Sequence, residues 1–312
     1  MRIGRNAGRT DTGRRRMRNE DAFICEPPLF AVADGMGGAR AGEIAAGLAA
    51  AALEEAGEEM RGATGIAELI EEANRRIWER SLTDPKTAGM GTTVTAALVD
   101  ADGGTVVIGH VGDSRAYLLR GDAIEQLTTD HSLVAELVES GILTPEEAER
   151  HPQRSAITRA LGTEPTVDVD AFTVEAAPGD LFLLCSDGLS TMVAEDEVVS
   201  AIEESQRDPE RAAAALVAAA NARGGEDNVT AVLFEIIEGT EDDEPLEPEG
   251  AAIAGTGSDL GLDQTPDTTT EAPSEAGVQR HGAGKGGRLA ALLLVAIALG
   301  VGLLVVYWGA TK

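Results

Sequence analysis

The sequence predicts an α+β fold in which helices pack against antiparallel β-structure. Between residues 92 and 127, four apolar runs are separated by short turns such as Asp102-Gly103-Gly104, which is the pattern of an antiparallel meander. Residues 66–77 repeat apolar side chains at spacings of three and four, which is typical of a helix buried on one face. With 43% hydrophobic residues among 312, the chain has enough apolar side chains for a sizeable core.

The N-terminal part is expected to begin with a polar, arginine-rich loop, and alternation of apolar and polar residues starts at residues 19–24. A short buried strand at residues 29–32 leads into Ala33-Asp34-Gly35-Met36-Gly37-Gly38. This stretch predicts a strand end, a carboxylate and a tight turn. An alanine-rich helix is expected at residues 41–56.

An insertion interrupts the second half of the domain. Residues 130–164 contain short helices, one of which starts at Thr144-Pro145, and an insertion between strands often covers a site. Beyond it we expect two strands, two helices and a closing strand, at residues 168–174, 180–185, 195–205, 209–222 and 227–236.

The C-terminal part differs in composition from residues 1–237. Residues 238–287 have few large apolar side chains, and their first 42 residues hold 12 acids and no Lys or Arg, which predicts a disordered acidic linker. Residues 288–312 contain an uncharged run at 289–308 that is long enough to cross a bilayer as a helix. A buried soluble helix is the alternative, but an isolated, wholly apolar terminal run favours a membrane span.

Flanking charges predict the orientation of this span. Arg280, Lys285 and Arg288 precede it and only Lys312 follows, so the positive-inside rule keeps residues 1–288 in the cytoplasm. The first 18 residues are arginine-rich without an apolar segment, which argues against a secretory signal. The sequence therefore predicts a single-pass cell-membrane protein with a cytoplasmic domain.

Charge and cysteine content exclude some classes of protein. The formal net charge is -29, so nucleic-acid phosphates would be repelled and no nucleic-acid partner is expected. Cys25 and Cys185 both lie in apolar, strand-like runs, where buried, reduced thiols are expected.

Several acidic residues stand at predicted strand ends or turns. One Asp-Gly step taken alone is more often a plain turn. Here Asp34 and Asp187 both end apolar strands and Asp227 begins one, so we expect their carboxylates to gather at one edge of an antiparallel sheet. Carboxylates that close repel one another unless a cation neutralises them, and Mg²⁺ and Mn²⁺ prefer oxygen ligands.

Two divalent ions held by such carboxylates can activate a water for in-line attack on phosphorus and stabilise charge on the phosphoryl oxygens. Arg16 precedes Asp21 by five residues, and its guanidinium can hold two phosphate oxygens at once. A solvated place in the Arg14 to Arg18 run is an equal alternative.

Six short motifs follow one another along the chain: Arg16-x-x-x-Glu20-Asp21, Ala33-Asp34-Gly35-Met36-Gly37-Gly38, Gly91-Thr92-Thr93, Gly112-Asp113-Ser114-Arg115, Cys185-Ser186-Asp187-Gly188-Leu189 and Asp227-Asn228-Val229-Thr230. In this order, over about residues 6–237, they resemble the motifs of the type-2C (PPM) metal-dependent protein serine/threonine phosphatases. Any one of them is weak evidence, but their shared order is specific.

The resemblance implies a four-layer α-β-β-α sandwich of two antiparallel sheets flanked by helices, here followed by one C-terminal transmembrane helix. It also implies a dinuclear Mn²⁺ or Mg²⁺ centre between the sheet edges. Asp34 would bridge both ions and Gly35 would offer its carbonyl to one of them. Asp187 and Asp227 would hold the other ion.

The remaining site residues are likewise implied by the family. Glu20 would act through coordinated water, with Asp21 behind it, and Arg16 would bind substrate phosphate. Asp113 would belong to a third, weaker metal site near residues 130–164, which correspond to the family's mobile flap. Bacterial members of this kind oppose membrane-bound Ser/Thr kinases, which implies those kinases and their phosphorylated substrates as partners of a monomeric enzyme.

One position departs from many eukaryotic relatives. They carry a histidine, a proposed general acid, where this chain has Met36, so a metal-held water is the first candidate for the leaving-group proton. His131 and His151, on or beside the flap, are weaker candidates.

Two other functions stay open: a phosphatase of a small phosphoester, and a non-catalytic phospho-binding module.

Overall fold

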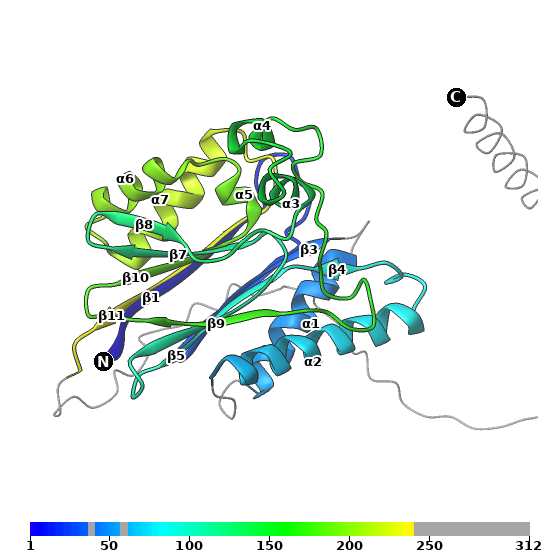
Figure 1. The fold of residues 1–312 in the computed structure, drawn as a ribbon, viewed down its shortest axis with the longest axis horizontal. Coiled ribbons are helices and arrows are strands. Elements are labelled where there is room, and N and C mark those ends of the chain that lie inside the picture. Colours follow the sequence, from blue (N-terminus) through cyan, green and yellow to red (C-terminus); the bar gives the residue numbers. More distant parts are fainter. Residues whose placement is uncertain (37–40, 57–61, 240–312) are drawn as a thin grey trace, which may run out of the picture. The chain divides into compact units, whose positions relative to one another are not determined.

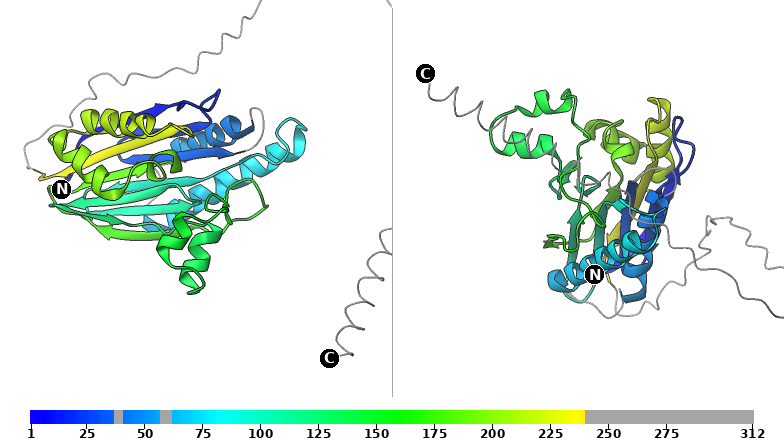
Figure 2. Two further views of the ribbon diagram at one scale, coloured as in Figure 1. Left: turned by 90° about the horizontal axis from the view of Figure 1, so that it is seen from above. Right: turned by 90° about the vertical axis from the view of Figure 1, so that its right-hand side faces the viewer.

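The computed structural model describes residues 1–36, 41–56 and 62–239, which lie within the compact unit Met1–Glu247. Two antiparallel sheets stack face to face, and helices cover both outer faces (Figures 1 and 2), so the predicted sandwich is confirmed. One sheet has the order β2 (Asp21–Glu26), β3 (Leu29–Met36), β5 (Val94–Asp100), β6 (Thr105–Val111) and β9 (Asp170–Glu175), with β4 (Gly91–Thr92) paired to β3. The other has the order β1 (Arg2–Asp11), β11 (Val229–Ile237), β10 (Leu181–Cys185), β7 (Arg115–Arg120) and β8 (Ala123–Gln126).

The helices pack on the sheets through apolar stripes. The six-stranded sheet carries α1 (Ala41–Ala56) and α2 (Gly62–Thr83), and Ala45, Ile66 and Ile70 are fully buried between them and the strands. The other sheet carries α5 (Asp187–Ser190), α6 (Glu195–Glu204) and α7 (Pro209–Ala222), while α3 (Leu133–Glu139) and α4 (Pro145–Glu149) belong to the insertion.

A third apolar layer joins the two sheets. Phe30, from the six-stranded sheet, stacks on Phe234 of β11 with ring centroids 4.1 Å apart. Phe234 in turn stacks on Phe182 at 5.0 Å. These rings supply large buried area in a chain with few aromatic residues. Cys25 and Cys185 are both free thiols, as expected, but only Cys185 is buried and Cys25 is partly exposed.

Two features of the sheets were not expected from the sequence. Residues 2–11, expected as loop, form the edge strand β1, which pairs with β11. The predicted meander also spans both sheets: β5 pairs with β6 and β7 pairs with β8, but the turn at Gly112 carries the chain from one sheet to the other. Gly112 has a φ of +116°, which suits glycine.

No helix within the described residues is long and apolar enough to cross a membrane. The expected span at 289–308, and all but the first two residues of the expected linker at 238–287, lie outside the residues that the structure describes.

Candidate active site

Strand register brings two acidic residues together on the six-stranded sheet. Asp21 begins β2 and is the direct partner of Asp34 in β3. Side chains of directly paired residues lie on the same face of a sheet, so both carboxylates face the same side. Asp34 does not end its strand as expected, because β3 continues to Met36 and pairs there with β4.

The five-stranded sheet supplies two more carboxylates. Asp187 opens α5 directly after β10, and Asp227 precedes β11, the antiparallel neighbour of β10. A side chain at Gly188 would collide with the backbone oxygen of Asn228, so glycine is needed for this close approach. The acids therefore converge from two facing sheets, which corrects the expectation that they share the edge of one sheet.

The backbone of Asp34 is held by threonines from the start of the neighbouring strands. Its N–H donates to Thr93 Oγ1 at 3.1 Å, and its carbonyl accepts from the Thr93 N–H and the Thr92 hydroxyl, both at 2.9 Å. Thr93 Oγ1 lies 2.7 Å from Ser114 Oγ in the next turn. These residues belong to the sequence motifs described above, but no role was predicted for them.

The glycine after Asp34 has no space for a side chain. A Cβ on Gly35 would collide with the backbone oxygens of Gly42 and Glu20. Gly42 is equally confined, because a Cβ there would lie 2.6 Å from Glu20 Oε2. Gly35, Gly42 and Glu20 therefore form one tightly packed backbone junction beside Asp34.

The four acids Asp21, Asp34, Asp187 and Asp227 are here called the carboxylate centre, and burial opposes the ionisation of the first three. Burial raises the pKa of Asp34 well above its usual range, and the charges of Asp21 and Asp187 add to the shift. Burial raises the pKa of Asp21 to about 7, against the lowering effect of its hydrogen bond with Thr230. The pKa of Asp187 is raised by burial and then by the charge of Asp227.

Arg16 forms an ion pair with the centre. Its Nη2 donates to Asp227 Oδ2 at 2.6 Å, and its side chain stays about half exposed. Burial works against the charged form of Arg16, but its hydrogen bond with Asp227 leaves the pKa of Arg16 raised. Burial raises the pKa of Glu20, with Arg16 opposing that shift. Arg16 thus lies where an anion at the centre would meet it.

Asp113 lies at the crossing between the sheets, close to the centre. It is 8% exposed, and burial, followed by the charges of Asp187 and Asp130, raises its pKa to about 7. Asp130 itself is paired with Arg115 at 2.8 Å. The charge of Arg115 opposes this shift, but Asp113 forms no ion pair within the described residues.

The fit of this site to a cation can be tested on its unpaired oxygens. Oδ1 of Asp21 and Oδ1 of Asp187 are buried and have no hydrogen-bond partner among the described residues. No three His, Cys, Asp or Glu side chains within residues 1–36, 41–56 and 62–239 converge closely enough to form a ready-made metal-binding group. Hard oxygen donors with unpaired oxygens nevertheless fit Mg²⁺ or Mn²⁺.

A chain of hydrogen bonds supports Asp21 from β11. Thr230 Oγ1 donates to Asp21 Oδ2 at 2.6 Å, and Thr10 Oγ1 lies 2.8 Å from Thr230 Oγ1. Asn19 Nδ2 donates to Thr10 at 2.7 Å. The role of Thr230 was missed, because a threonine in a β-branched run fits a strand on propensity alone.

The two histidines weighed as proton donors occupy different places. His131 is 7% exposed; its Nδ1 accepts from the Gly112 N–H at 3.0 Å and its Nε2 lies 3.1 Å from Asp170 Oδ2. Burial lowers the pKa of His131 at the base of the flap. His151 lies after α4, where its Nδ1 accepts from the Gln153 N–H. Met36 pairs with Gly91 across β3 and β4.

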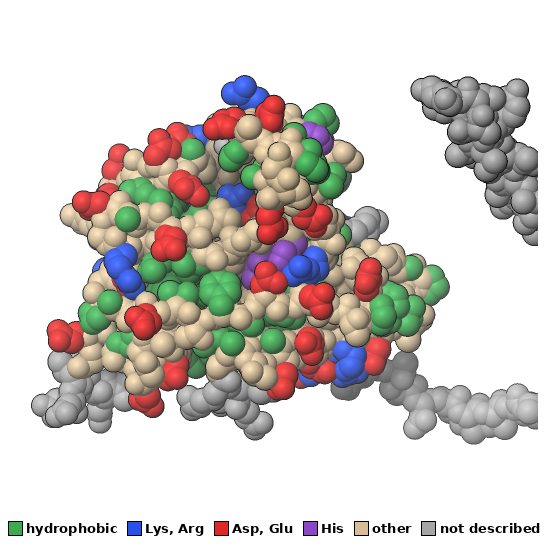
Figure 3. Space-filling view, in the orientation of Figure 1, with side chains coloured by type: hydrophobic (Ala, Val, Ile, Leu, Met, Phe, Trp, Pro, Cys, Tyr) green, Lys and Arg blue, Asp and Glu red, His purple; other side chains and the backbone are tan. Residues whose placement is uncertain are grey.

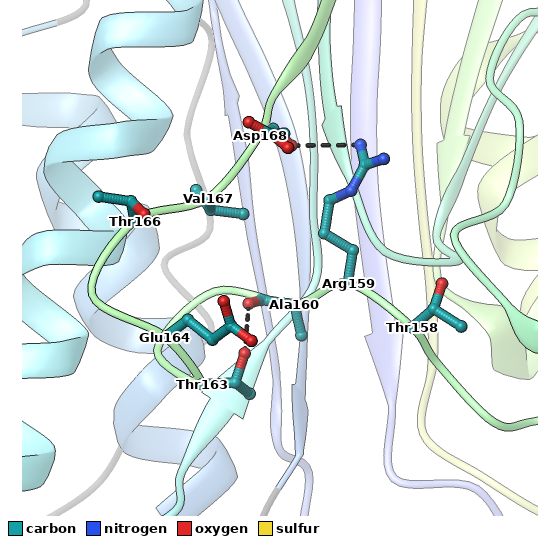
Figure 4. A pocket seen from close by; sticks show the side chains of 8 residues that line it. All are labelled: Thr158, Arg159, Ala160, Thr163, Glu164, Thr166, Val167 and Asp168. Carbon is teal, nitrogen blue, oxygen red and sulfur yellow. Dashed lines mark hydrogen bonds between the residues drawn. The ribbon is translucent and has the colours of Figure 1, made fainter.

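A cavity of about 270 Å³ opens at the base of the flap, lined by Thr158, Arg159, Ala160, Thr163, Glu164, Thr166, Val167 and Asp168. Figure 4 shows Arg159 pointing toward Asp168, to whose backbone oxygen it donates at 3.2 Å. None of the lining residues belongs to the carboxylate centre, so this cavity is separate from it.

Comparisons with known proteins identify the family of the chain. The family model described as protein phosphatase 2C matches residues 12–224. The chain belongs to this family. It is 42% identical to the serine/threonine phosphatase stp of Listeria innocua, over 73% of this chain and 94% of that protein. It is 41% identical to the serine/threonine protein phosphatase PstP of Mycobacterium tuberculosis, over 75% of this chain and 45% of that protein.

Solved structures of family members have the same fold. The Mycobacterium tuberculosis phosphatase PstP/Ppp superposes with a TM-score of 0.72 at 38% identity, covering 76% of this chain and all of that one. The PstP catalytic domain in complex with two manganese ions has a TM-score of 0.69 at 36% identity, covering 76% of this chain and 99% of that one.

Proposed function

We propose that this chain is a metal-dependent protein phosphatase that hydrolyses phosphoserine and phosphothreonine in proteins. The observation that carries the proposal is the convergence of buried acids with unpaired oxygens beside an exposed arginine. The serine/threonine phosphatases to which the chain is similar support the substrate class.

In this proposal the carboxylates of Asp34, Asp187 and Asp227 and the Gly35 carbonyl would hold two divalent ions, and Glu20 would contribute through water. The ions, Mn²⁺ or Mg²⁺, would supply a nucleophile at neutral pH and neutralise charge on the phosphoryl oxygens. The two manganese ions in the PstP complex support this number.

The chain's own residues prepare the site. Asp21, fixed by Thr230, holds negative charge behind the ligands, and Thr92 and Thr93 fix the position of Asp34. Arg16 binds the substrate phosphate through its guanidinium, which is exposed enough to exchange Asp227 for a phosphate oxygen.

We do not propose His131 as the group that protonates the leaving alcohol, because both of its ring nitrogens already have partners at the base of the flap. Asp113 is proposed to contribute to a third, weaker cation site, since it is buried near Asp187 and Asp130.

The cellular setting is part of the same proposal. Residues 289–308 anchor the chain in the cell membrane, and residues 1–288 stay cytoplasmic. The enzyme acts as a monomer. Its partners are membrane-bound Ser/Thr kinases and their substrates. The uncharged C-terminal run and its flanking cations support this setting. Alkaline carbonate extraction of membranes tests it: the full chain should stay in the pellet, and recovery in the supernatant would contradict the anchor.

The activity is tested with purified full-length protein on a phosphothreonine peptide. Hydrolysis should require added Mn²⁺ or Mg²⁺ and stop with EDTA. Asp187→Asn should abolish hydrolysis while the circular dichroism spectrum stays unchanged. Hydrolysis that continues in EDTA would refute the metal-dependent activity.

A further inference from the structure

Among the described residues, most Lys and Arg side chains without an ion pair lie in two short segments. The chain has 54 acids against 25 Lys and Arg, and most described arginines are bound to a carboxylate. Among the described residues, five cationic side chains form neither an ion pair nor a side-chain hydrogen bond: Arg14, Arg18, Arg150, Arg154 and Lys86. Four of these five belong to two short segments, one in the loop that precedes Glu20 and one in the flap.

The first segment, residues 12–18, is here called the arginine loop. The Asn228 side-chain amide donates to the backbone oxygens of Thr12 and Arg18, at 2.9 and 2.8 Å. The Arg14 N–H donates to the backbone oxygen of Gly225 at 2.7 Å. The loop is therefore fixed at both ends, and Met17 in it is 98% exposed.

The second segment is the part of the flap that carries α3 and α4. Its turn is ordered by a capping box between Thr144 and Glu147. Ile142, just before this turn, is 66% exposed, and the exposed Arg150 and Arg154 follow α4. Each segment thus presents two unpaired arginines with one large exposed apolar side chain.

The arginine loop borders the carboxylate centre through Arg16, and the base of the flap lies next to Asp113. The arginine loop runs directly into Glu20 and Asp21, and the flap starts where the His131 N–H donates to the backbone oxygen of Gly112, next to Asp113. In Figure 2 the loop, in dark blue, and the flap, in green, lie on opposite sides of the same end of the sandwich. On the face shown in Figure 3, acidic side chains are spread widely while basic ones are few. Exposed cations at the site are therefore exceptional for this surface.

We infer that the arginine loop and the flap together bind phosphoprotein segments whose phosphorylated residue is flanked by acidic side chains. This inference rests on the proposed protein phosphatase activity and names its preferred substrates. Acidic flanks would pair with Arg14, Arg18, Arg150 and Arg154, whereas a basic segment would meet the acids that cover the surrounding surface. Met17 and Ile142 would contact apolar side chains of the bound segment.

An anionic membrane surface is the other possible partner for cations with exposed apolar side chains. The large negative charge of the whole chain disfavours it, because a leaflet of anionic lipid would repel the domain.

The test uses two phosphothreonine peptides of equal length, one with Glu and one with Gln flanking the phosphorylated residue, and p-nitrophenyl phosphate as a substrate without flanks. For the full-length chain at low salt, kcat/KM should favour the Glu peptide by about tenfold, and 0.5 M NaCl should remove most of this preference. Arg14→Glu with Arg18→Glu, or Arg150→Glu with Arg154→Glu, should reduce the preference severalfold. Hydrolysis of p-nitrophenyl phosphate should not change.

The matched control is Lys86→Glu with Arg211→Glu, which changes the net charge equally at exposed sites outside both segments and should keep the preference. Equal hydrolysis of both peptides by the unmodified chain would overturn the inference and leave the phosphatase activity standing. Failure to hydrolyse any of the three substrates would instead overturn the proposed function. Reduced binding of the variants to phosphatidylglycerol vesicles, with peptide preference intact, would assign the cations to the membrane and overturn the inference.

Discussion

Strand β10 has an aspartate at each end, and the two have opposite surroundings. Asp180, just before the strand, is 2% exposed and accepts from Arg120 Nε at 2.8 Å, Arg120 Nη2 at 2.6 Å and the Ala177 N–H at 2.7 Å. Asp187, just after it, has one buried oxygen without a partner, and its acidic neighbours raise its pKa. Hydrogen-bond and ion-pair partners therefore distinguish the two acids, although both are aspartates beside the same strand.

The two acids also have opposite effects on the free energy of unfolding. A buried carboxylate with an arginine and a backbone donor stabilises the fold once formed, and breaking such a pair is costly. Buried carboxylates that face one another destabilise the fold until a cation binds. We therefore expect substitutions at the two ends of β10 to have opposite effects on stability, and only the substitution of Asp187 to reduce activity.

The largest expected effect is on catalysis. Asp34→Asn should reduce Mn²⁺-dependent hydrolysis of a phosphothreonine peptide by about a thousandfold or more, because it removes charge at the point where the acids converge. Asp180→Asn should keep the activity within about twofold, because Asp180 lies at the other end of the sheet. Steady-state kinetics on both proteins, with circular dichroism as the folding control, measure this contrast. Equal losses in both variants would break the comparison.

A smaller loss is expected where a residue only positions an acid. Thr230→Val removes the 2.6 Å hydrogen bond to Asp21 without changing the side-chain shape, and should weaken Mn²⁺ activation about tenfold. The Mn²⁺ concentration for half-maximal activity should rise more than kcat falls. Thr230→Ser, which keeps the hydroxyl, should restore activation, and an unchanged Mn²⁺ response in Thr230→Val would contradict the positioning role.

Stability should change in opposite directions at the two ends. Asp180→Asn should lower the free energy of unfolding by about 2 kcal/mol, because Arg120 is half exposed and the pair is partly screened. Asp187→Asn should raise it in EDTA, since one repelling charge is removed. Urea denaturation in EDTA measures both. A loss of stability in Asp187→Asn of the same size would contradict the account.

The metal-free protein should also become less stable as the pH rises above 6.5. The folded-state pKa values of Asp21 and Asp113 are raised from 3.8 to about 7, so the stability that their protonated forms contribute at low pH is lost as the pH rises through 7. His110, whose pKa burial lowers to about 3, acts only below 6.5. The Tm in EDTA should fall between pH 6.5 and 8.5, and less so in Asp21→Asn. A Tm that rises over this range would refute the raised pKa values.

Local patterns in the sequence predict much of this fold. The alanine-rich run gives α1 at Ala41–Ala56 as expected, and the Asp-Gly steps mark two of the converging acids. These features are set by neighbours in the sequence. The span at 289–308 stays a prediction.

What the sequence did not predict depends on distant partners. Strand β1 has few apolar residues and is stabilised by pairing with β11, more than 200 residues away, while Arg5 on it binds Asp208 and Glu235. Edge strands with charged side chains lack the usual alternation. The pairing of Asp21 with Asp34, and the convergence of acids from two sheets, follow from register and packing, which no local pattern specifies.

The central claim is that the carboxylate centre is built for a cation. Isothermal titration of Mn²⁺ into the full-length chain, Asp34→Asn and Asp180→Asn tests it without depending on catalysis. We predict that the unmodified chain and Asp180→Asn bind Mn²⁺ alike, and that Asp34→Asn binds at least about 100-fold more weakly. Equal Mn²⁺ affinity in Asp34→Asn and the unmodified chain would contradict the account.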